Sequence, residues 1–150
     1  MQGNLLDGSI AVAEVAAYFE RYGWDFFYVD DLSLRTVVAE GTGGAPDAAL
    51  VAQVDAPFVY FRMFPFSGRP VPPDAEYRQL LELADRATPF KLSLDEEGIL
   101  VVSVEYFAAL VDYEVFQVTM DGFITFLQET YGELAHIMGM PVAAMEGRFE

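Results

Sequence analysis

The chain has 150 residues, of which 53% are hydrophobic, and it carries 24 acidic residues against 8 lysines and arginines, a net charge of −16. That charge argues against direct binding to nucleic acid or to an anionic membrane surface, because both would repel it. The lack of cysteine excludes disulfides and thiolate metal sites and fits a reducing cytoplasm. We therefore expect one cytoplasmic domain over residues 1–150, with residues 1–8 and 139–150 loose and with neither a signal peptide nor a membrane span.

The first periodic segment predicts a helix over residues 9–22. Ser9 is the expected N-cap, and Gly23 is expected to end the helix in a left-handed conformation. Apolar residues recur at spacings of three and four, which is typical of one helix face packed on a core. These residues are Val12, Val15, Phe19 and Tyr22.

The next part of the chain is rich in strand-forming residues. It predicts strands over residues 26–29, 34–39, 49–54 and 58–64. The tetrapeptide DDLS at 30–33 is either a bulge within one strand or a turn between two. The glycine-rich segment 41–46 predicts a loop rather than a phosphate-binding motif, because it lacks the third glycine of one such motif and the lysine of the other.

The strand over residues 58–64, FVYFRMF, is apolar on both faces. Alternation sends Val59, Phe61 and Met63 to one face and Phe58, Tyr60, Arg62 and Phe64 to the other. One face is expected to be ordinary core. The second face, together with Phe66, is predicted to be a partner or dimer surface, covered either by a second copy of the chain or by a client segment.

A second helix is predicted from a cap at Asp74 to about residue 87. Its expected apolar face holds Tyr77, Leu80, Leu81 and Ala84, and Arg78 and Glu82 are spaced for an ion pair on another face.

The stretch KLSLDEEGILVVSVEY, residues 91–106, predicts a hairpin. We expect residues 95–98 to form a turn with Gly98 left-handed, so that Leu94 pairs with Leu100 and Leu92 with Val102. The three acids of this turn do not have the alternating spacing of a calcium loop.

The last apolar pattern predicts a long helix that begins between Glu114 and Asp121, ends near Met138 and is closed by Gly139 and Pro141. Its expected apolar stripe consists of Phe123, Phe126, Leu127, Tyr131, Leu134 and Met138.

No catalytic constellation is predicted, and no metal or cofactor. His136, the only histidine, is expected to be a partly exposed residue at a helix end, three residues after Glu133. Asp30 and Asp31 point apart, as neighbours in a strand do. Glu105 could pair with an arginine such as Arg62, and such pairs are expected by chance among 24 acids.

Two segments carry a resemblance to a known family. These are RYGWDFFYVDD, residues 21–31, and FKLSLDEEGILVVSVEY, residues 90–106. With them the chain resembles the bacterial YbjN-like family of sensory transduction regulators and is similar in architecture to type III secretion chaperones. The second helix departs from the family pattern, because it lacks the asparagines that members often carry there.

The resemblance implies an α+β fold: an antiparallel sheet with helices on one face, in the order α-β-β-β-α-β-β-α. It also implies a non-enzymatic homodimer that binds another protein in chaperone-like or regulatory fashion. Two alternatives stay open. The net charge of −16 would suit a basic partner, such as a nucleic-acid-binding protein engaged by phosphate mimicry, and the acid count would suit a small carboxylate-based, metal-dependent enzyme.

Overall fold

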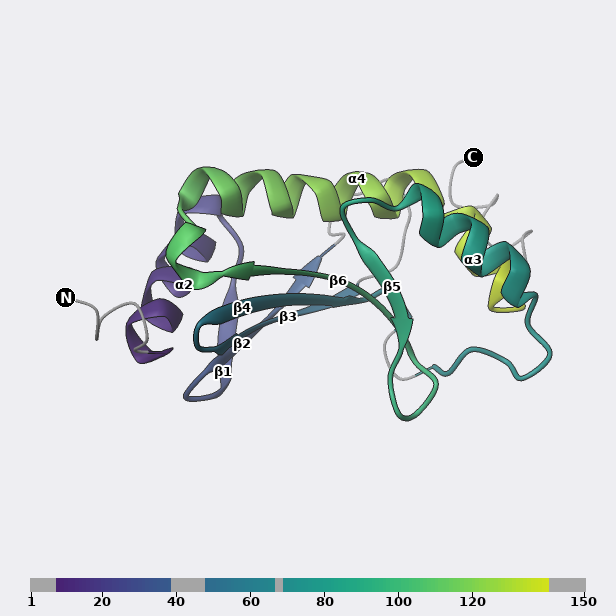
Figure 1. The fold of residues 1–150 in the computed structure, drawn as a ribbon, viewed down its shortest axis with the longest axis horizontal. Coiled ribbons are helices and arrows are strands. Elements are labelled where there is room, and N and C mark those ends of the chain that lie inside the picture. Colours follow the sequence, from purple (N-terminus) through teal and green to yellow (C-terminus); the bar gives the residue numbers. More distant parts are fainter. Residues whose placement is uncertain (1–7, 39–47, 67–68, 141–150) are drawn as a thin grey trace.

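The computed structural model describes residues 8–38, 48–66 and 69–140, and the predicted loop at 41–46 lies outside these ranges. The fold is α+β, with a six-stranded antiparallel sheet and helices on one face, which confirms the predicted class (Figure 1). Of the two alternatives for DDLS, the structure has the turn: Asp31 and Leu32 connect two separate strands.

The strands lie in the order β1-β2-β3-β4-β6-β5, and every neighbouring pair is antiparallel. β1 and β5 are therefore the two edges of the sheet. The bounds are Phe26–Asp30 for β1, Ser33–Val38 for β2, Ala48–Asp55 for β3, Phe58–Phe64 for β4, Lys91–Leu94 for β5 and Leu100–Phe107 for β6.

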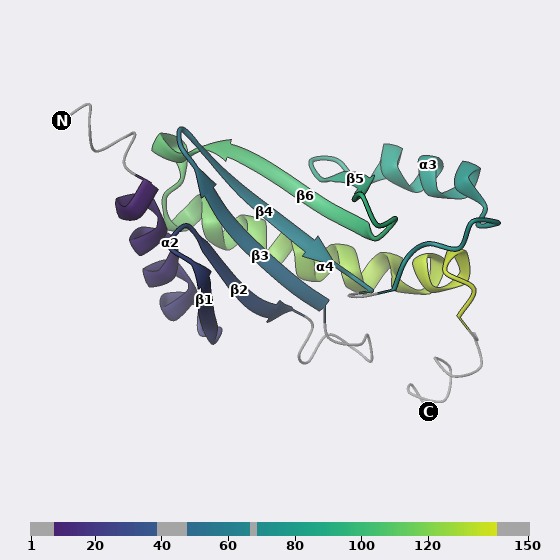
Figure 2. The same ribbon diagram turned by 90° about the horizontal axis from the view of Figure 1, so that it is seen from below.

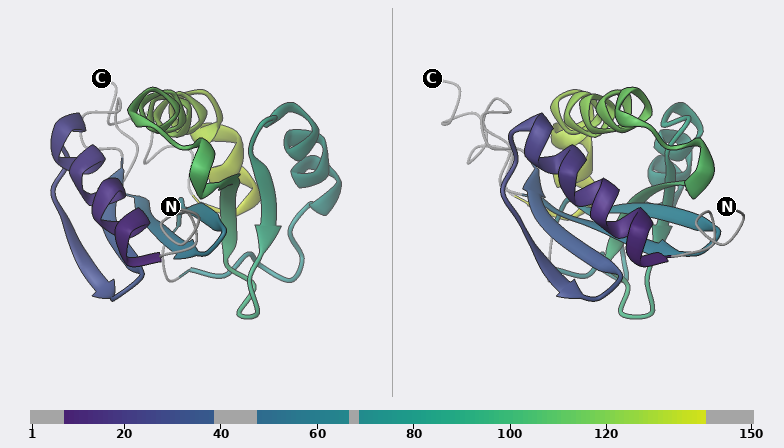
Figure 3. Two further views of the ribbon diagram at one scale, coloured as in Figure 1. Left: turned by 60° about the vertical axis from the view of Figure 1, so that its left-hand side comes forward. Right: turned by 90° about the vertical axis from the view of Figure 1, so that its left-hand side faces the viewer.

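Within the described residues, three α-helices lie on one face of the sheet. α2 (Gly8–Tyr22) lies at the β1 end, α4 (Tyr113–Ile137) runs along the middle and α3 (Tyr77–Arg86) lies beside β5. A short 3₁₀ turn, η1 (Ala108–Leu110), leads into α4. The view from below looks onto the strands with α4 behind them, and the side views place α4 over the same face (Figures 2 and 3).

The helix ends differ from the predictions in detail. Ser9 already lies inside α2, and α3 has Glu76 rather than Asp74 at its N-cap position, with no side-chain hydrogen bond there. α4 begins one residue before the predicted interval because the Asp112 carboxylate accepts a hydrogen bond from the Val115 N–H, at 2.9 Å. Gly23 ends α2 at φ 94°, as predicted.

The C-terminal end of α4 is closed by two residues that we expected to be loose. Gly139 (φ 73°) donates its N–H to the His136 carbonyl, and the Met140 N–H bonds to the Ala135 carbonyl. Gly8, also expected to be loose, lies in α2. The rest of both predicted tails, residues 1–7 and 141–150, lies outside the described ranges, and Pro141 with them.

The core lies between the helices and the covered face of the sheet. Phe19 of α2 meets Phe116 of α4 edge-on, with ring centroids 4.9 Å apart, and both rings are fully buried. The whole predicted stripe of α4 is buried as well. Helix periodicity therefore identified the residues that join α4 to the sheet.

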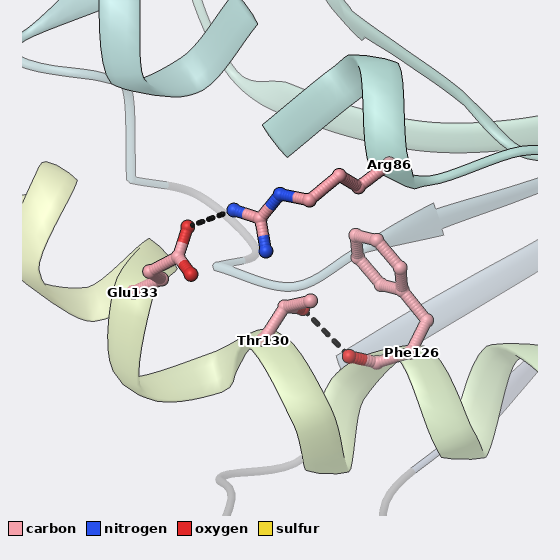
Figure 4. A network of polar contacts seen from close by, with 4 residues as sticks. All are labelled: Arg86, Phe126, Thr130 and Glu133. Carbon is pink, nitrogen blue, oxygen red and sulfur yellow. Dashed lines mark hydrogen bonds and ion pairs between the residues drawn. The ribbon is translucent and has the colours of Figure 1, made fainter. Parts of the chain in front are cut away.

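α3 is attached to the rest of the fold through α4. Arg86 at the end of α3 donates to the Glu133 carboxylate of α4 at 2.8 Å (Figure 4). Beside this ion pair, within α4, the Thr130 hydroxyl donates to the Phe126 carbonyl. On α3 itself, Arg78 and Glu82 form the predicted i,i+4 ion pair at 3.3 Å.

The hairpin of β5 and β6 has the predicted register. Leu92 pairs with Val102 and Leu94 with Leu100, and Gly98 has φ 79°. The Asp95 carboxylate accepts hydrogen bonds from the N–H groups of Glu97 and Ile99, at 2.8 and 3.0 Å. The Asp95 side chain therefore stabilises the turn through hydrogen bonds to the backbone, a role that the sequence analysis did not predict.

Candidate functional site

β4 has one covered and one uncovered side. Val59, Phe61 and Met63 point towards the helices and are at most 1% exposed. Phe58, Tyr60, Arg62 and Phe64 point away from the helices and are only half-buried. We call the side of the sheet that faces away from the helices the open face; Figure 2 looks onto it.

Aromatic rings gather at one end of the open face. Phe58 stacks on Phe107 of β6, its ladder partner, with centroids 5.0 Å apart, and also contacts Tyr60. The guanidinium of Arg62 lies 5.0 Å from the Tyr60 ring centroid. Phe107 is 54% exposed, so this end of the sheet presents an aromatic surface to solvent.

Phe66 does not belong to this surface, contrary to the prediction. It is 6% exposed and stacks on Tyr131 of α4, with centroids 5.5 Å apart. The alternation ends with β4 at Phe64, and the turn that follows directs Phe66 into the core. The prediction placed Phe66 on the same face as Phe64, although it lies two residues beyond the end of the strand.

Polar groups surround the aromatic rings. Arg62 donates to the side-chain oxygen of Gln53 on β3 at 2.8 Å, rather than pairing with Glu105 as we considered. Glu105 instead lies 4.0 Å from the ammonium of Lys91. Arg62, Lys91 and Glu105 line a surface hollow of about 250 Å³, together with Tyr60, Pro89, Ser103 and Val104.

A second apolar surface lies between α3 and β5. Only Leu80 of the predicted α3 face is buried; Leu83 and Ala87 complete the core-facing side, and Leu81 is 72% exposed. We call this the α3–β5 hollow. It measures about 230 Å³ and is lined by Tyr77, Leu80, Leu81, Ala84, Leu92, Ser93, Leu94 and Leu100.

The edge strand β1 is the third apolar region. Phe27, Tyr28 and Val29 are all more than half exposed. A further hollow of about 510 Å³ runs along this edge and includes Phe27 of β1 and Arg35 of β2. An exposed edge strand can accept another strand by backbone pairing.

Two other groups considered for catalysis, His136 and Asp30, lie outside the three hollows described above. His136 is exposed, and Glu133 binds Arg86 rather than the histidine. Asp30 caps the turn after β1 by accepting from the Leu32 N–H. No group of three or more histidines and acids in the described ranges is placed to hold a metal ion, and no helix in those ranges is long and apolar enough to cross a membrane.

Two tyrosines of the helical layer have perturbed acidity. Burial raises the pKa of Tyr22, and the hydrogen bond that its hydroxyl donates to the Asp121 carboxylate raises it further. Burial, followed by the charges of Glu14 and Asp112, raises the pKa of Tyr18. Both groups are kept in the neutral form, which suits a structural hydroxyl and not a proton acceptor.

No family model and no curated protein sequence matches the chain. Solved structures do match it. A chain of the heterodimeric ExoU–SpcU complex from the type III secretion system of Pseudomonas aeruginosa aligns with a TM-score of 0.54 at 19% identity, covering 81% of this chain and 94% of that one. A chain of the HopA1–SchA chaperone–effector complex gives 0.55 at 11% identity, with 78% and 91% covered.

A chain of the ExsC–ExsE complex gives a TM-score of 0.54 at 16% identity, with 81% and 93% covered. The molecule therefore has a type III secretion chaperone-like fold, as the resemblance implied. The match covers nearly the whole of each related chain, so the similarity concerns a complete domain. At these identities the likeness establishes architecture.

Sequence reasoning missed two parts of these surfaces. Phe107 has the same strand parity as Glu105, so continuing the alternation by two residues would have placed it on the open face. The α3–β5 hollow had no such signal. It depends on the position of α3 relative to β5, which a pattern within either element does not specify.

Proposed function

We propose that the protein is a non-enzymatic protein-binding module, chaperone-like or regulatory, that acts as a homodimer and holds a segment of another protein on the open face. The observation that carries the proposal is β4, whose second side combines Phe58, Tyr60 and Phe64 at half burial. When a strand has aromatic residues on both sides, burial of the side that its own helices leave exposed is favourable, and a second protein chain can provide that burial.

The fold supports this proposal. Two of the related structures are described as chaperone–effector or type III secretion complexes, each containing a second protein. A domain with the same architecture is suited to present a sheet face and helix grooves to a polypeptide. Membership of the YbjN-like family remains part of the proposal, carried by residues 21–31 and 90–106.

We assign the dimer contact to the α3–β5 hollow. Leu81 is the most exposed of the large apolar side chains in the described ranges, and its neighbours in the hollow are almost all apolar. A self-complementary apolar patch is what a two-fold interface requires. The open face is then left for the client.

The test combines mass measurement with capture. Light scattering after gel filtration is expected to give twice the chain mass for the wild type and the monomer mass for Leu81→Asp. Affinity capture from the native cell, read by mass spectrometry, is expected to recover one protein with the wild type and to lose it with Tyr60→Ser plus Phe64→Ser. A monomeric wild type whose captured proteins are the same with and without these two substitutions contradicts the proposal.

A second candidate rests on the distribution of charge. Many of the described acids lie on the helices, among them Glu14, Glu82 and Glu129, and others lie in the turns at Asp31 and at residues 95–97. This would suit a basic protein, including one that binds nucleic acid. Binding of that kind is expected to weaken steeply as salt is added, and binding independent of salt would contradict it. No described feature favours the metal-dependent enzyme.

A further inference from the structure

A line of cations crosses the open face of this acidic protein. Strand pairing places Phe27, Arg35, Val51, Arg62, Ser103 and Lys91 side by side, one from each strand of the sheet. Residues paired in this way share one face. Arg35, Arg62 and Lys91, which we call the cation row, therefore all point away from the helices.

The spacing of the cation row follows from the sheet. Arg35 and Arg62 are two strands apart, and so are Arg62 and Lys91. Neighbouring strands lie about 4.8 Å apart, so adjacent cations of the row are separated by roughly 10 Å along a line perpendicular to the strands. Small side chains, Val51 and Ser103, stand between them.

The charges of the cation row are poorly neutralised by the chain itself. Within residues 8–38, 48–66 and 69–140 neither Arg35 nor Arg62 forms an ion pair, although acids outnumber cations threefold in the sequence. Lys91 reaches Glu105 only at 4.0 Å, between two exposed groups, which is a weak contact. The other acids of this face, Asp30 and Asp55, lie at strand ends.

Each cation of the row also lies beside a surface hollow. Arg35 lines the hollow along β1, and Arg62 and Lys91 line the hollow that contains Tyr60 and Ser103. The row is bordered by aromatic rings on one side, and by Phe64 on the other. A carboxylate can therefore approach a cation while an apolar neighbour in the same segment contacts a ring.

We propose that the cation row selects an acidic, apolar-containing segment of another protein, whose carboxylates bind Arg35, Arg62 and Lys91 across the strands. This inference rests on the proposed function and specifies the chemistry of its client. The guanidinium fork of arginine suits bidentate binding of a carboxylate. The partner is thus opposite in charge to the basic protein considered above, and it binds the opposite side of the sheet.

Two other occupants fit less well. Two copies packed open face to open face would bring identical cation rows together, and like charges in contact are costly. A nucleic acid places a charge at every phosphate and would meet Glu105 and the strand-end acids as well as the acidic remainder of the molecule. A peptide can leave gaps between its carboxylates and fill them with apolar side chains.

Fluorescence anisotropy with defined probes tests the inference. The probes are a labelled peptide built only of Glu, Leu and Ser, its counterpart in which every Glu is Lys, and single-stranded oligothymidine. The acidic peptide is expected to bind the wild type, to bind at least tenfold more weakly to Arg35→Glu or Arg62→Glu, and to weaken with added salt. Arg78→Glu on α3, an exposed residue with the same change of charge, is the matched control and should bind normally.

Several outcomes would overturn the inference. These are tighter binding of the lysine peptide or the oligothymidine, equal losses with Arg78→Glu, failure of the acidic peptide to bind the wild type, or loss of the dimer in Arg62→Glu. None of them refutes the wider proposed function if capture of a client still depends on Tyr60 and Phe64. Thermal unfolding of each variant checks that a loss of peptide binding is not caused by unfolding of the variant.

Discussion

The two sides of β4 differ in what covers them, although they alternate along one heptapeptide. Val59, Phe61 and Met63 are sealed by α2 and α4, whereas Phe58, Tyr60 and Phe64 keep part of their surface in water. Three of the four side chains on the open side are aromatic, and the fourth is Arg62. The difference in burial therefore arises from the positions of the helices, which leave these three aromatic rings without a full cover.

The largest effect that we expect separates these two sides directly. Phe61→Ala should lower the free energy of unfolding by about 3–5 kcal/mol, because it leaves a cavity between the sheet and α4. Tyr60→Ala should cost less than about 1.5 kcal/mol, since the Tyr60 ring is only half-buried. Chemical denaturation at low protein concentration measures both.

Equal costs for the two substitutions would contradict the comparison. They would mean that the open face is covered in solution by another part of an assembly, and the cost of Tyr60→Ala would then rise with protein concentration. A cost that stays small at every concentration indicates a face that is open in the free protein.

Much of this architecture follows from local patterns. Alternation in residues 58–64 predicted both sides of β4, and the glycine at position 98 predicted the hairpin register to the residue. The predicted apolar stripe of α4 was also correct, because the helical periodicity is regular and continues over several turns. Each of these features is encoded within a single element or a single turn.

The remaining features depend on how the elements meet. Leu81 was expected to be buried and is exposed, because α3 turns Leu83 and Ala87 to the core instead. The cation row is formed by four ladders, which pair residues up to 41 positions apart, as in Arg62 and Ser103, and no short window of the sequence contains it. Alternation could therefore predict the candidate site for the residues of β4 and for Phe107 of β6, but not for the cation row.

A smaller effect tests the register that keeps the two sides separate. Gly98→Ala should destabilise the protein by about 1–2 kcal/mol, because an L-residue is strained at the φ of 79° found there. A steric clash is not the cause of this loss of stability, since a Cβ added at Gly98 would contact only Pro70, at 3.8 Å. Gly98→Asn should lose less, and Glu97→Ala in the same turn should be close to neutral. Equal stability of all three variants would show that the turn does not fix the hairpin.

The smallest effect concerns the helices that cover the buried side. The Tyr22 hydroxyl of α2 donates to the Asp121 carboxylate of α4, and the raised pKa of Tyr22 means that folding favours its neutral form. The stabilisation is therefore complete below the ordinary tyrosine pKa of about 10 and is lost as the pH rises above it towards the folded-state value. Because the contact is partly exposed, Tyr22→Phe should cost about 0.5–1 kcal/mol at neutral pH.

The pH dependence distinguishes this contact from simple packing. Thermal unfolding followed from neutral to alkaline pH should show the wild type and Tyr22→Phe converging above a pH of about 10, because Tyr22 ionises in the unfolded wild-type chain while the folded state still holds the proton. Tyr28→Phe, which removes an exposed hydroxyl from β1, is the matched control and should follow the wild type throughout. A constant difference in stability between wild type and Tyr22→Phe at every pH would mean that α2 and α4 are linked by the contact of the Tyr22 and Phe116 rings, and not by the hydroxyl proton.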